Sequence, residues 1–152
     1  MSQQPEVNGD RGCIILVTSP AGVEGQKGQT AYGASKGAVN GMVLPITREL
    51  GKLKIRVMAI SPGVFITPMT DLVPKKAMDV LKAHSPLARF GVPAEFAHLA
   101  QSIIENPFIN GGIWRIDGGM RMPNLWLFAF IYLENFYFNL QIKNIMLIFH
   151  QP

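Results

Sequence analysis

The sequence has one cysteine, no long uninterrupted apolar run and no concentrated basic stripe. Cys13 is the single cysteine, so an intrachain disulfide framework and a zinc site built from several cysteines are excluded. No apolar stretch approaches the ~20 residues that a membrane-spanning helix needs. The net charge is +4, but the basic residues are scattered rather than interleaved with aromatics, so nucleic acid is not indicated as a partner. These absences leave a globular domain suited to a reducing compartment.

The C-terminal residues 123–152 contain no glycine and few charged residues. All 15 glycines lie at or before Gly119, and Glu134 and Lys143 are the only charged residues after it apart from Arg121. We expect residues 123–152 to be an apolar tail outside the folded domain, disordered or non-native, with an interfacial or partner-binding segment as the alternative. At the other end, residues 1–12 are expected to form a polar lead-in that is neither a signal peptide nor a transit peptide.

The remaining residues alternate between strand and helix patterns. Short β-branched runs bounded by Gly and Pro predict buried strands, and apolar residues at helical spacing predict helices. This order predicts an α/β fold in which parallel strands are joined by right-handed crossovers. The expected strands are 13–18, 55–60 and 113–116, and the expected helices are 30–50, 93–105 and a short one near 75–83.

Tyr32 and Lys36 stand four residues apart in the predicted 30–50 helix, and so share one face. A free phenol titrates near 10 and is a poor base at neutral pH, but a neighbouring ammonium favours the phenolate. The pair is therefore a sensible proton donor and acceptor for an alcohol or a carbonyl. By itself this spacing is more often an ordinary solvated helix face.

Two further segments follow predicted strands. Ser19 comes directly after the first strand, and Pro62-Gly63-Val64-Phe65-Ile66-Thr67 follows the second. In an α/β sheet, the carboxyl ends of the strands face the ligand crevice. A hydroxyl at Ser19 can bond a substrate oxygen there, and a bulk-free backbone at Gly63 can admit a flat ring. Taken singly, Ser19 is better explained as a turn-forming residue ahead of Pro20, and the Pro62-Gly63 segment can be an ordinary turn at a strand end.

The ordered set of strand-Ser, Tyr/Lys helix and strand-Pro-Gly-x-x-x-Thr resembles the short-chain dehydrogenase/reductase family over about residues 12–122. The resemblance implies the C-terminal half of a Rossmann-like, doubly wound parallel sheet, with about three strands and flanking helices. Several local segments resemble the branch of this family that acts on 3-hydroxyacyl-CoA and hydroxysteroids. These segments are Glu24-Gly25-Gln26, Leu44-Pro45-Ile46, 104–108, 116–118 and Arg121-Met122.

The resemblance also implies roles. Tyr32 would be the general acid/base, Lys36 would lower its pKa and hold the nicotinamide ribose, and Ser19 would orient the substrate oxygen. The residues lining the nicotinamide end of NAD would be Pro62, Gly63, Phe65 and Thr67, together with Tyr32 and Lys36, and no metal is implied. The reaction would interconvert a secondary alcohol and a ketone. The family further implies a homo-oligomer formed through the 30–50 helix and the last strand, and a mitochondrial location, whereas this sequence taken alone indicates the cytoplasm.

The sequence departs from the family pattern at its start. No glycine-rich pyrophosphate-binding turn occurs in residues 1–12. We therefore expect weakened NAD binding, an unpaired edge on the 13–18 strand and impaired activity. NAD is preferred to NADP on the resemblance only. Two alternatives stay open: an inactive module that pairs with a full-length relative, and a membrane-associated protein that uses the 124–152 tail.

Overall fold

The computed structural model describes residues 1–122 and 146–149. Its first half contains β1 (Gly12–Val17), the 3-10 turn η1 (Pro20–Gly22), the long helix α1 (Thr30–Gly51) and β2 (Ile55–Pro62). Its second half contains η2 (Thr70–Leu72), α2 (Lys75–Ala83), α3 (Pro93–Glu105), β3 (Ile113–Ile116) and β4 (Met146–Phe149). The five elements expected from sequence pattern between residues 13 and 105 are present, and the expected strand 113–116 matches β3.

The strands form one sheet in the order β3-β2-β1-β4. β1 and β3 both pair parallel with β2, as the α/β pattern predicts. β4 pairs antiparallel with β1, placing Cys13 opposite Phe149 and Leu16 opposite Met146. The expectation of an unpaired edge on the first strand is therefore wrong, because β4 supplies the missing ladder. The rest of the predicted tail, 123–145 and 150–152, lies outside the described residues.

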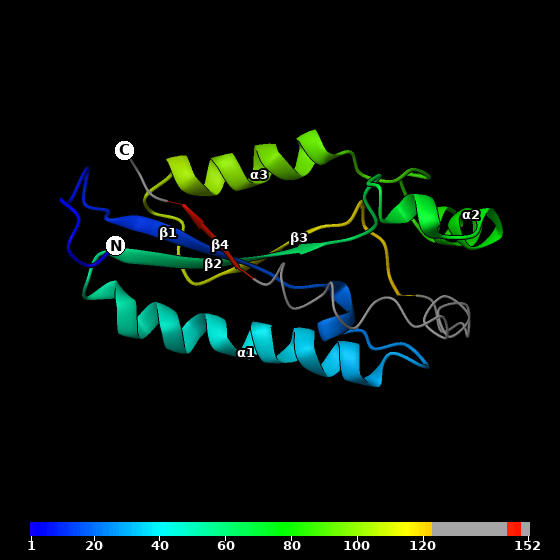
Figure 1. Cartoon of the computed structure of the whole chain (residues 1–152), viewed down its shortest axis with the longest axis horizontal. Helices are drawn as coiled ribbons and strands as arrows, with labels where there is room; N and C mark the ends of the chain where they lie inside the picture. The colour runs from blue at the N-terminus through cyan, green and yellow to red at the C-terminus, as the bar shows by residue number, and fades with distance from the viewer. Residues whose placement is uncertain (123–145, 150–152) are drawn as a thin grey trace.

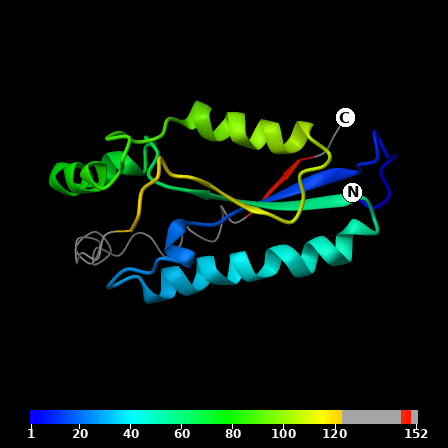
Figure 2. The same ribbon diagram turned by 180° about the vertical axis from the view of Figure 1, so that it is seen from behind.

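Helices cover both faces of the sheet. In Figure 1, α3 lies above the strands and α1 below them, and Figure 2 shows the same three layers from behind. Each layer boundary holds its own apolar cluster. Cys13, Ile15, Met58 and Ile60 pack with the α3 residues Ala100 and Ile103. On the other face, Leu16, Val57 and Ala59 pack with Val39 and Val43 of α1.

The strand sequences explain this arrangement. Successive side chains of a strand point to opposite faces, so a strand buried on both faces reads as a continuous apolar run. In β1 the odd positions Cys13 and Ile15 face α3, while Leu16 faces α1. In β2 the burial is almost unbroken from Ile55 to Ser61. The two-sided burial places the sheet at the centre of the core.

The polar lead-in is tied to this core by a buried ion pair. Arg56 Nε donates to Asp10 Oδ2 at 2.8 Å, and both side chains are about 5% exposed. The same guanidinium donates to the carbonyl oxygens of Ile103, Ile104 and Ile109, near the end of α3. A helix leaves its last carbonyls without internal partners, so Arg56 satisfies two of them. The lead-in thereby helps to fix α3 against the sheet.

Only small differences separate expected from observed bounds. β2 runs two residues past the expected end, through Pro62, because Ser61 and Pro62 pair with Arg115 and Ile116 of β3. The 19–29 loop contains η1, and the 64–92 stretch contains η2 and α2. Within the described ranges, no helix is long and apolar enough to cross a membrane.

Candidate active site

The carboxyl ends of β1 and β2 meet at one edge of the sheet. Val17 pairs with Ile60, and the Thr18 amide donates to the Ile60 carbonyl oxygen at 2.9 Å. Parallel strands place the residues that follow them at the same edge. Ser19, after β1, and the segment that begins at Pro62, at the end of β2, are therefore neighbouring segments, as the sequence pattern indicates.

Ser19 is fixed as the first residue of a turn. It precedes η1 in an extended conformation, and its Oγ accepts a hydrogen bond from the Ala21 amide at 3.2 Å. Pro20 occupies the first turn position, where a missing N–H costs nothing. The Ser19 side chain also lies close enough to the Tyr32 hydroxyl to favour the ionised form of the phenol. The structure thus brings together two residues that stand thirteen positions apart.

Lys36 lies one helical turn after Tyr32 on α1. It is bonded by Val17, the last residue of β1, and by Thr18, which follows. Its Nζ donates to the Val17 carbonyl oxygen at 3.1 Å, and Thr18 Oγ1 donates to the Lys36 carbonyl oxygen at 3.1 Å. The Lys36 Nζ lies 5.8 Å from the centroid of the Tyr32 ring. The amino group therefore lies beside the phenol ring, and the three predicted catalytic side chains form one cluster.

The electrostatics of Tyr32 differ from the sequence expectation. Burial raises the pKa of the Tyr32 phenol, and the Ser19 hydrogen bond opposes that rise without cancelling it. Burial also lowers the pKa of Lys36. Lys36 is not among the causes of the Tyr32 shift. Desolvation sets the direction for both groups, because each charged form loses water on burial.

Small residues let η1 pack directly on α1. A Cβ at Gly22 would lie 2.8 Å from the backbone carbon of Lys36 and 3.0 Å from the Gly37 nitrogen. A Cβ at Gly33 would lie 3.1 Å from the Ala21 carbonyl oxygen. The small-residue half of the helix thus contacts the turn that carries Ser19. This contact sets the separation between Ser19 and the Tyr32 helix.

Gly63 meets a different neighbour from the one expected. A Cβ there would lie 2.8 Å from Asp117 Cβ and 2.9 Å from Asp117 Cα. The Gly63 amide donates to the Ile116 carbonyl oxygen at 3.0 Å, which extends the pairing of β2 with β3. The absence of a side chain at Gly63 is therefore required by the chain itself, at the crossing with Asp117. A flat ring next to Gly63 would therefore have to fit beside Asp117.

Phe65 and Thr67 are both engaged in local structure. The Phe65 ring packs edge-on against Phe96, with 6.1 Å between centroids, and would clash with any side chain at Gly91. The Thr67 amide donates to Thr70 Oγ1, and its carbonyl oxygen accepts from the same hydroxyl. These contacts shape the segment after Pro62. The ring of Phe65 faces the side of α3 rather than the Ser19 cluster.

Sequence reasoning missed the positioning role of Thr18. Thr18 is 2% exposed, and together with Val17 it anchors both ends of Lys36. A hydroxyl at the end of a fully apolar strand is the signal that could have pointed to this role.

Comparisons with known proteins agree with this geometry. Residues 2–121 match the family model described as Enoyl-(Acyl carrier protein) reductase, so the polar lead-in is included. Human 3-hydroxyacyl-CoA dehydrogenase type-2 is 52% identical over 120 residues, which are 78% of this chain and 46% of that protein. The mouse protein of the same name is 51% identical over the same share. The chain spans about half the length of these curated relatives.

Solved structures share the fold. The crystal structure of 3-hydroxyacyl-CoA dehydrogenase type-2 from Mycobacterium avium superposes with a TM-score of 0.77 at 40% identity, covering 82% of this chain and 49% of that one. A 7 alpha-hydroxysteroid dehydrogenase complexed with NADH and 7-oxo glycochenodeoxycholic acid gives a TM-score of 0.69 at 26% identity, covering 74% and 46%. With the extent of the family match and the Ser19, Tyr32 and Lys36 cluster, these results identify the chain as a member of the short-chain dehydrogenase/reductase family.

Proposed function

We propose that this chain acts as an NAD-dependent oxidoreductase that interconverts a secondary alcohol and a ketone, with a 3-hydroxyacyl-CoA as the first substrate class and a hydroxysteroid as the second. The observation that carries the proposal is the placement of the Ser19 side chain beside the Tyr32 hydroxyl and of the Lys36 amino group beside the Tyr32 ring. The names of the relatives support the substrate classes.

The Tyr32 hydroxyl is the group that moves the proton. Its raised pKa keeps the phenol protonated at neutral pH, which suits donation to the oxygen of a ketone during reduction. In the opposite direction, the same oxygen must accept the alcohol proton. Ser19 lies beside the phenol, so a substrate oxygen placed between the two hydroxyls would be oriented by one and exchange its proton with the other.

Lys36 would hold the cofactor ribose. An ammonium has three N–H donors, and the described contacts engage one of them, with the Val17 carbonyl oxygen. The remaining donors suit the hydroxyls of a ribose, so the donor set fits a nicotinamide nucleoside. When bound, the nicotinamide would carry the hydride, which NADH gives up in ketone reduction and NAD accepts in alcohol oxidation. NAD is chosen over NADP because a related structure carries NADH.

We expect the chain on its own to bind NAD weakly. The glycine-rich turn that holds a pyrophosphate at a helix N-terminus does not occur in residues 1–12. The contacts that the described site offers a cofactor are those proposed for its nicotinamide end. We propose that catalysis by this chain alone is correspondingly slower than that of a full-length relative.

The assembly and location of the chain are also proposals. The exposed side chains of Leu44 on α1 and of Ile113 and Trp114 on β3 are 51%, 41% and 39% accessible. Exposed apolar side chains on a helix and an edge strand suit an interface between copies of the chain. The same exposed side chains would serve the alternative function, an inactive module that pairs with a full-length relative. A mitochondrial location follows from the family resemblance alone.

The test is NADH oxidation with acetoacetyl-CoA, using the purified chain. We expect measurable turnover that falls by roughly 100-fold in Tyr32→Phe, because the proton donor is lost. Ser102→Ala is the matched control, since the Ser102 hydroxyl bonds only its own helix, at the His98 carbonyl oxygen. Equal rates in wild type and Tyr32→Phe would refute the proposal. Absence of NADH binding, together with capture by a full-length relative, would favour the module.

A further inference from the structure

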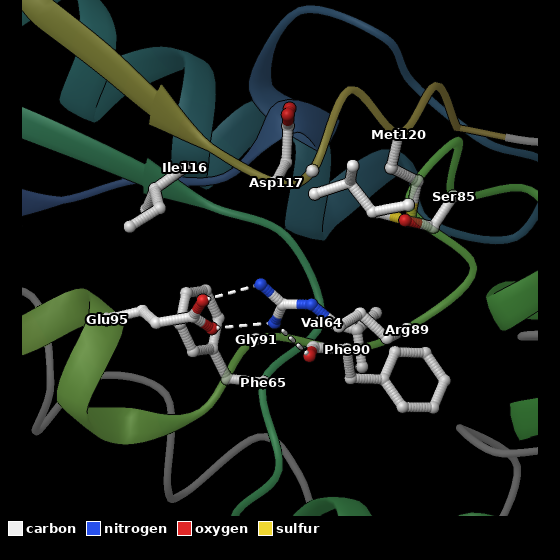
Figure 3. A pocket seen from close by; sticks show the side chains of 12 residues that line it. Val64, Phe65, Ser85, Arg89, Phe90, Gly91, Glu95, Ile116, Asp117 and Met120 are labelled. Carbon is white, nitrogen blue, oxygen red and sulfur yellow. Dashed lines mark hydrogen bonds and ion pairs between the residues drawn. The ribbon is translucent and has the colours of Figure 1, made fainter.

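A cavity lies away from the cluster formed by Ser19, Tyr32 and Lys36. It has a volume of about 130 Å³ and lies between the segment after β2, the 85–91 loop and the residues that follow β3. Figure 3 shows its lining side chains converging from these three segments. Most of them are apolar, and neither Ser19, Tyr32 nor Lys36 belongs to the lining. The apolar members are Val64, Phe65, Leu87, Phe90, Ile116 and Met120.

One polar side chain in this lining has no partner. Ser85 is 6% exposed, and its Oγ makes no hydrogen bond within the described part of the chain. Figure 3 shows this oxygen turned toward the cavity beside Met120. Burying a hydroxyl without a hydrogen bond costs free energy, so such a group in a native fold calls for a partner. A molecule in the cavity would supply one.

The backbone keeps the space around Ser85 open. A Cβ at Gly118 would lie 3.2 Å from Ser85 Oγ, and Gly118 has a φ of +63°, which disfavours any other residue. The wall beyond it is fixed by Arg115, which bonds both Asp117 and the Met120 carbonyl oxygen. The opening beside Ser85 is therefore maintained by a held backbone.

The charges at the cavity are already paired. The Arg89 guanidinium forms two hydrogen bonds with the Glu95 carboxylate, at 2.9 and 2.6 Å. The Asp117 carboxylate accepts from Arg115 and from the Gly119 amide. An ionic ligand would have to displace one of these pairs. An uncharged ligand would not.

We propose that this cavity is a binding site for a small uncharged molecule that has one hydrogen-bonding oxygen on an apolar body of about ring size. A cavity of about 150 Å³ with apolar walls is known to accommodate benzene, so a volume of this order admits a six-membered ring. The oxygen would bond Ser85 Oγ, and the apolar body would contact Phe65, Leu87 and Ile116. The site is separate from the proposed catalytic cluster.

Phenol is the probe, because it combines such a ring with one hydroxyl, and benzene is the matched probe without the oxygen. Amide chemical shifts of the labelled full chain are followed during titration. We expect saturable shifts at Gly91, Gly118 and Met120, with phenol binding more tightly than benzene. Ser85→Ala should weaken phenol binding roughly five-fold and leave benzene unchanged or tighter, as expected for one neutral hydrogen bond.

Two further variants make the test decisive. Ser85→Leu fills the cavity and should abolish binding of both probes, while Ser102→Ala should change neither. Equal phenol affinity in wild type and Ser85→Ala would overturn the proposal. Shifts confined to the Tyr32 region would also overturn it, as would no shift at these three amides with either probe, which would indicate a cavity that holds water only.

Discussion

Tyr32, the proposed proton donor, lies in a partly desolvated setting. Its phenol is stabilised in the neutral form by burial, while Ser19 supplies one hydrogen bond that favours the anion. Burial also lowers the pKa of the Lys36 amino group. A proton donor with these properties is ready for reduction at neutral pH, whereas oxidation requires the phenol to give up its proton first. The direction of the chemistry is therefore expected to depend on pH.

This desolvation predicts a pH-dependent stability. The folded-state pKa of Tyr32 lies above the unfolded value of 10.0. Any stability linked to this group is fully present below that value and is lost as pH rises through the folded pKa, because the unfolded chain ionises first. The free energy of unfolding of wild type should therefore fall relative to that of Tyr32→Phe above pH 10. Urea unfolding from pH 8 to pH 11 measures the difference.

Lys36 is present in both proteins, so its own titration largely cancels in this comparison. Below about pH 9 the difference in free energy of unfolding between wild type and Tyr32→Phe should be constant. In that range the Tyr32 phenol is protonated in both the folded and the unfolded wild-type chain. Parallel stability curves across the whole pH range would show that Tyr32 is not desolvated as described.

At the scale of single residues, the sequence predicts the grouping of Ser19, Tyr32 and Lys36 but not the contacts that support it. Ser19, Tyr32 and Lys36 could be predicted because their spacing and their places after a strand and on a helix have chemical consequences. The anchoring of Lys36 by Thr18 could not, because that bond joins positions 18 and 36 across two elements. The sign of the Tyr32 pKa change depends on burial, which spacing alone does not report.

At the scale of elements, the contact between η1 and α1 governs the site. The turn that carries Ser19 rests on the helix that carries Tyr32, at a distance permitted only by Gly22 and Gly33. α1 also contains Pro45, which removes one helical hydrogen bond. The half of the helix before Pro45 carries the site, so the break lies beyond the catalytic cluster.

Gly22→Ala tests this contact. The new methyl would lie 2.8 Å from the Lys36 backbone, which cannot move as a flexible side chain can. We expect a loss of about 1–3 kcal/mol in the free energy of unfolding, in line with overpacked sites, together with a larger Ser19–Tyr32 separation. Gly25→Ala is the matched control, because nothing lies within 4 Å of its added Cβ. Equal urea midpoints for the two variants would contradict this account of the turn.

The bounds of the elements followed from local pattern, and the partner of β1 did not. Runs of β-branched residues and Pro93 at a helix start are local signals. The antiparallel pairing of β4 with β1 joins segments about 130 residues apart. Residues 124–152 show no clean period, so pattern alone could not place a strand there. The Asp10–Arg56 ion pair is equally invisible to local reasoning, since it spans 46 positions.

At the scale of the whole molecule, the sheet joins a strand near the start of the chain, β1, to a strand near its end, β4. β4 satisfies backbone groups of β1 that would otherwise form an open edge. Open edges are templates for pairing with another chain. In the described part of the sheet, the one antiparallel strand therefore pairs with β1, so that β1 is not itself an edge.

A chain ending at residue 145 should expose this edge. We expect it to self-associate and to unfold at a lower urea concentration than the intact chain, because the ladder to β1 is lost. A chain ending at residue 149 is the control, since it keeps β4. Light scattering after size-exclusion chromatography measures the association. Two monomeric chains with equal midpoints would mean that β4 contributes nothing to the sheet.

The most direct test of the central claim is the binding of nicotinamide mononucleotide to the intact chain, followed by amide chemical shifts. This ligand contains the half of NAD that the Ser19, Tyr32 and Lys36 cluster is proposed to hold. We predict saturable shifts at Lys36, Gly63 and Val64 at millimolar ligand, weakened in Lys36→Met. An unchanged spectrum, or shifts that Lys36→Met leaves intact, would contradict a nicotinamide site at this edge of the sheet.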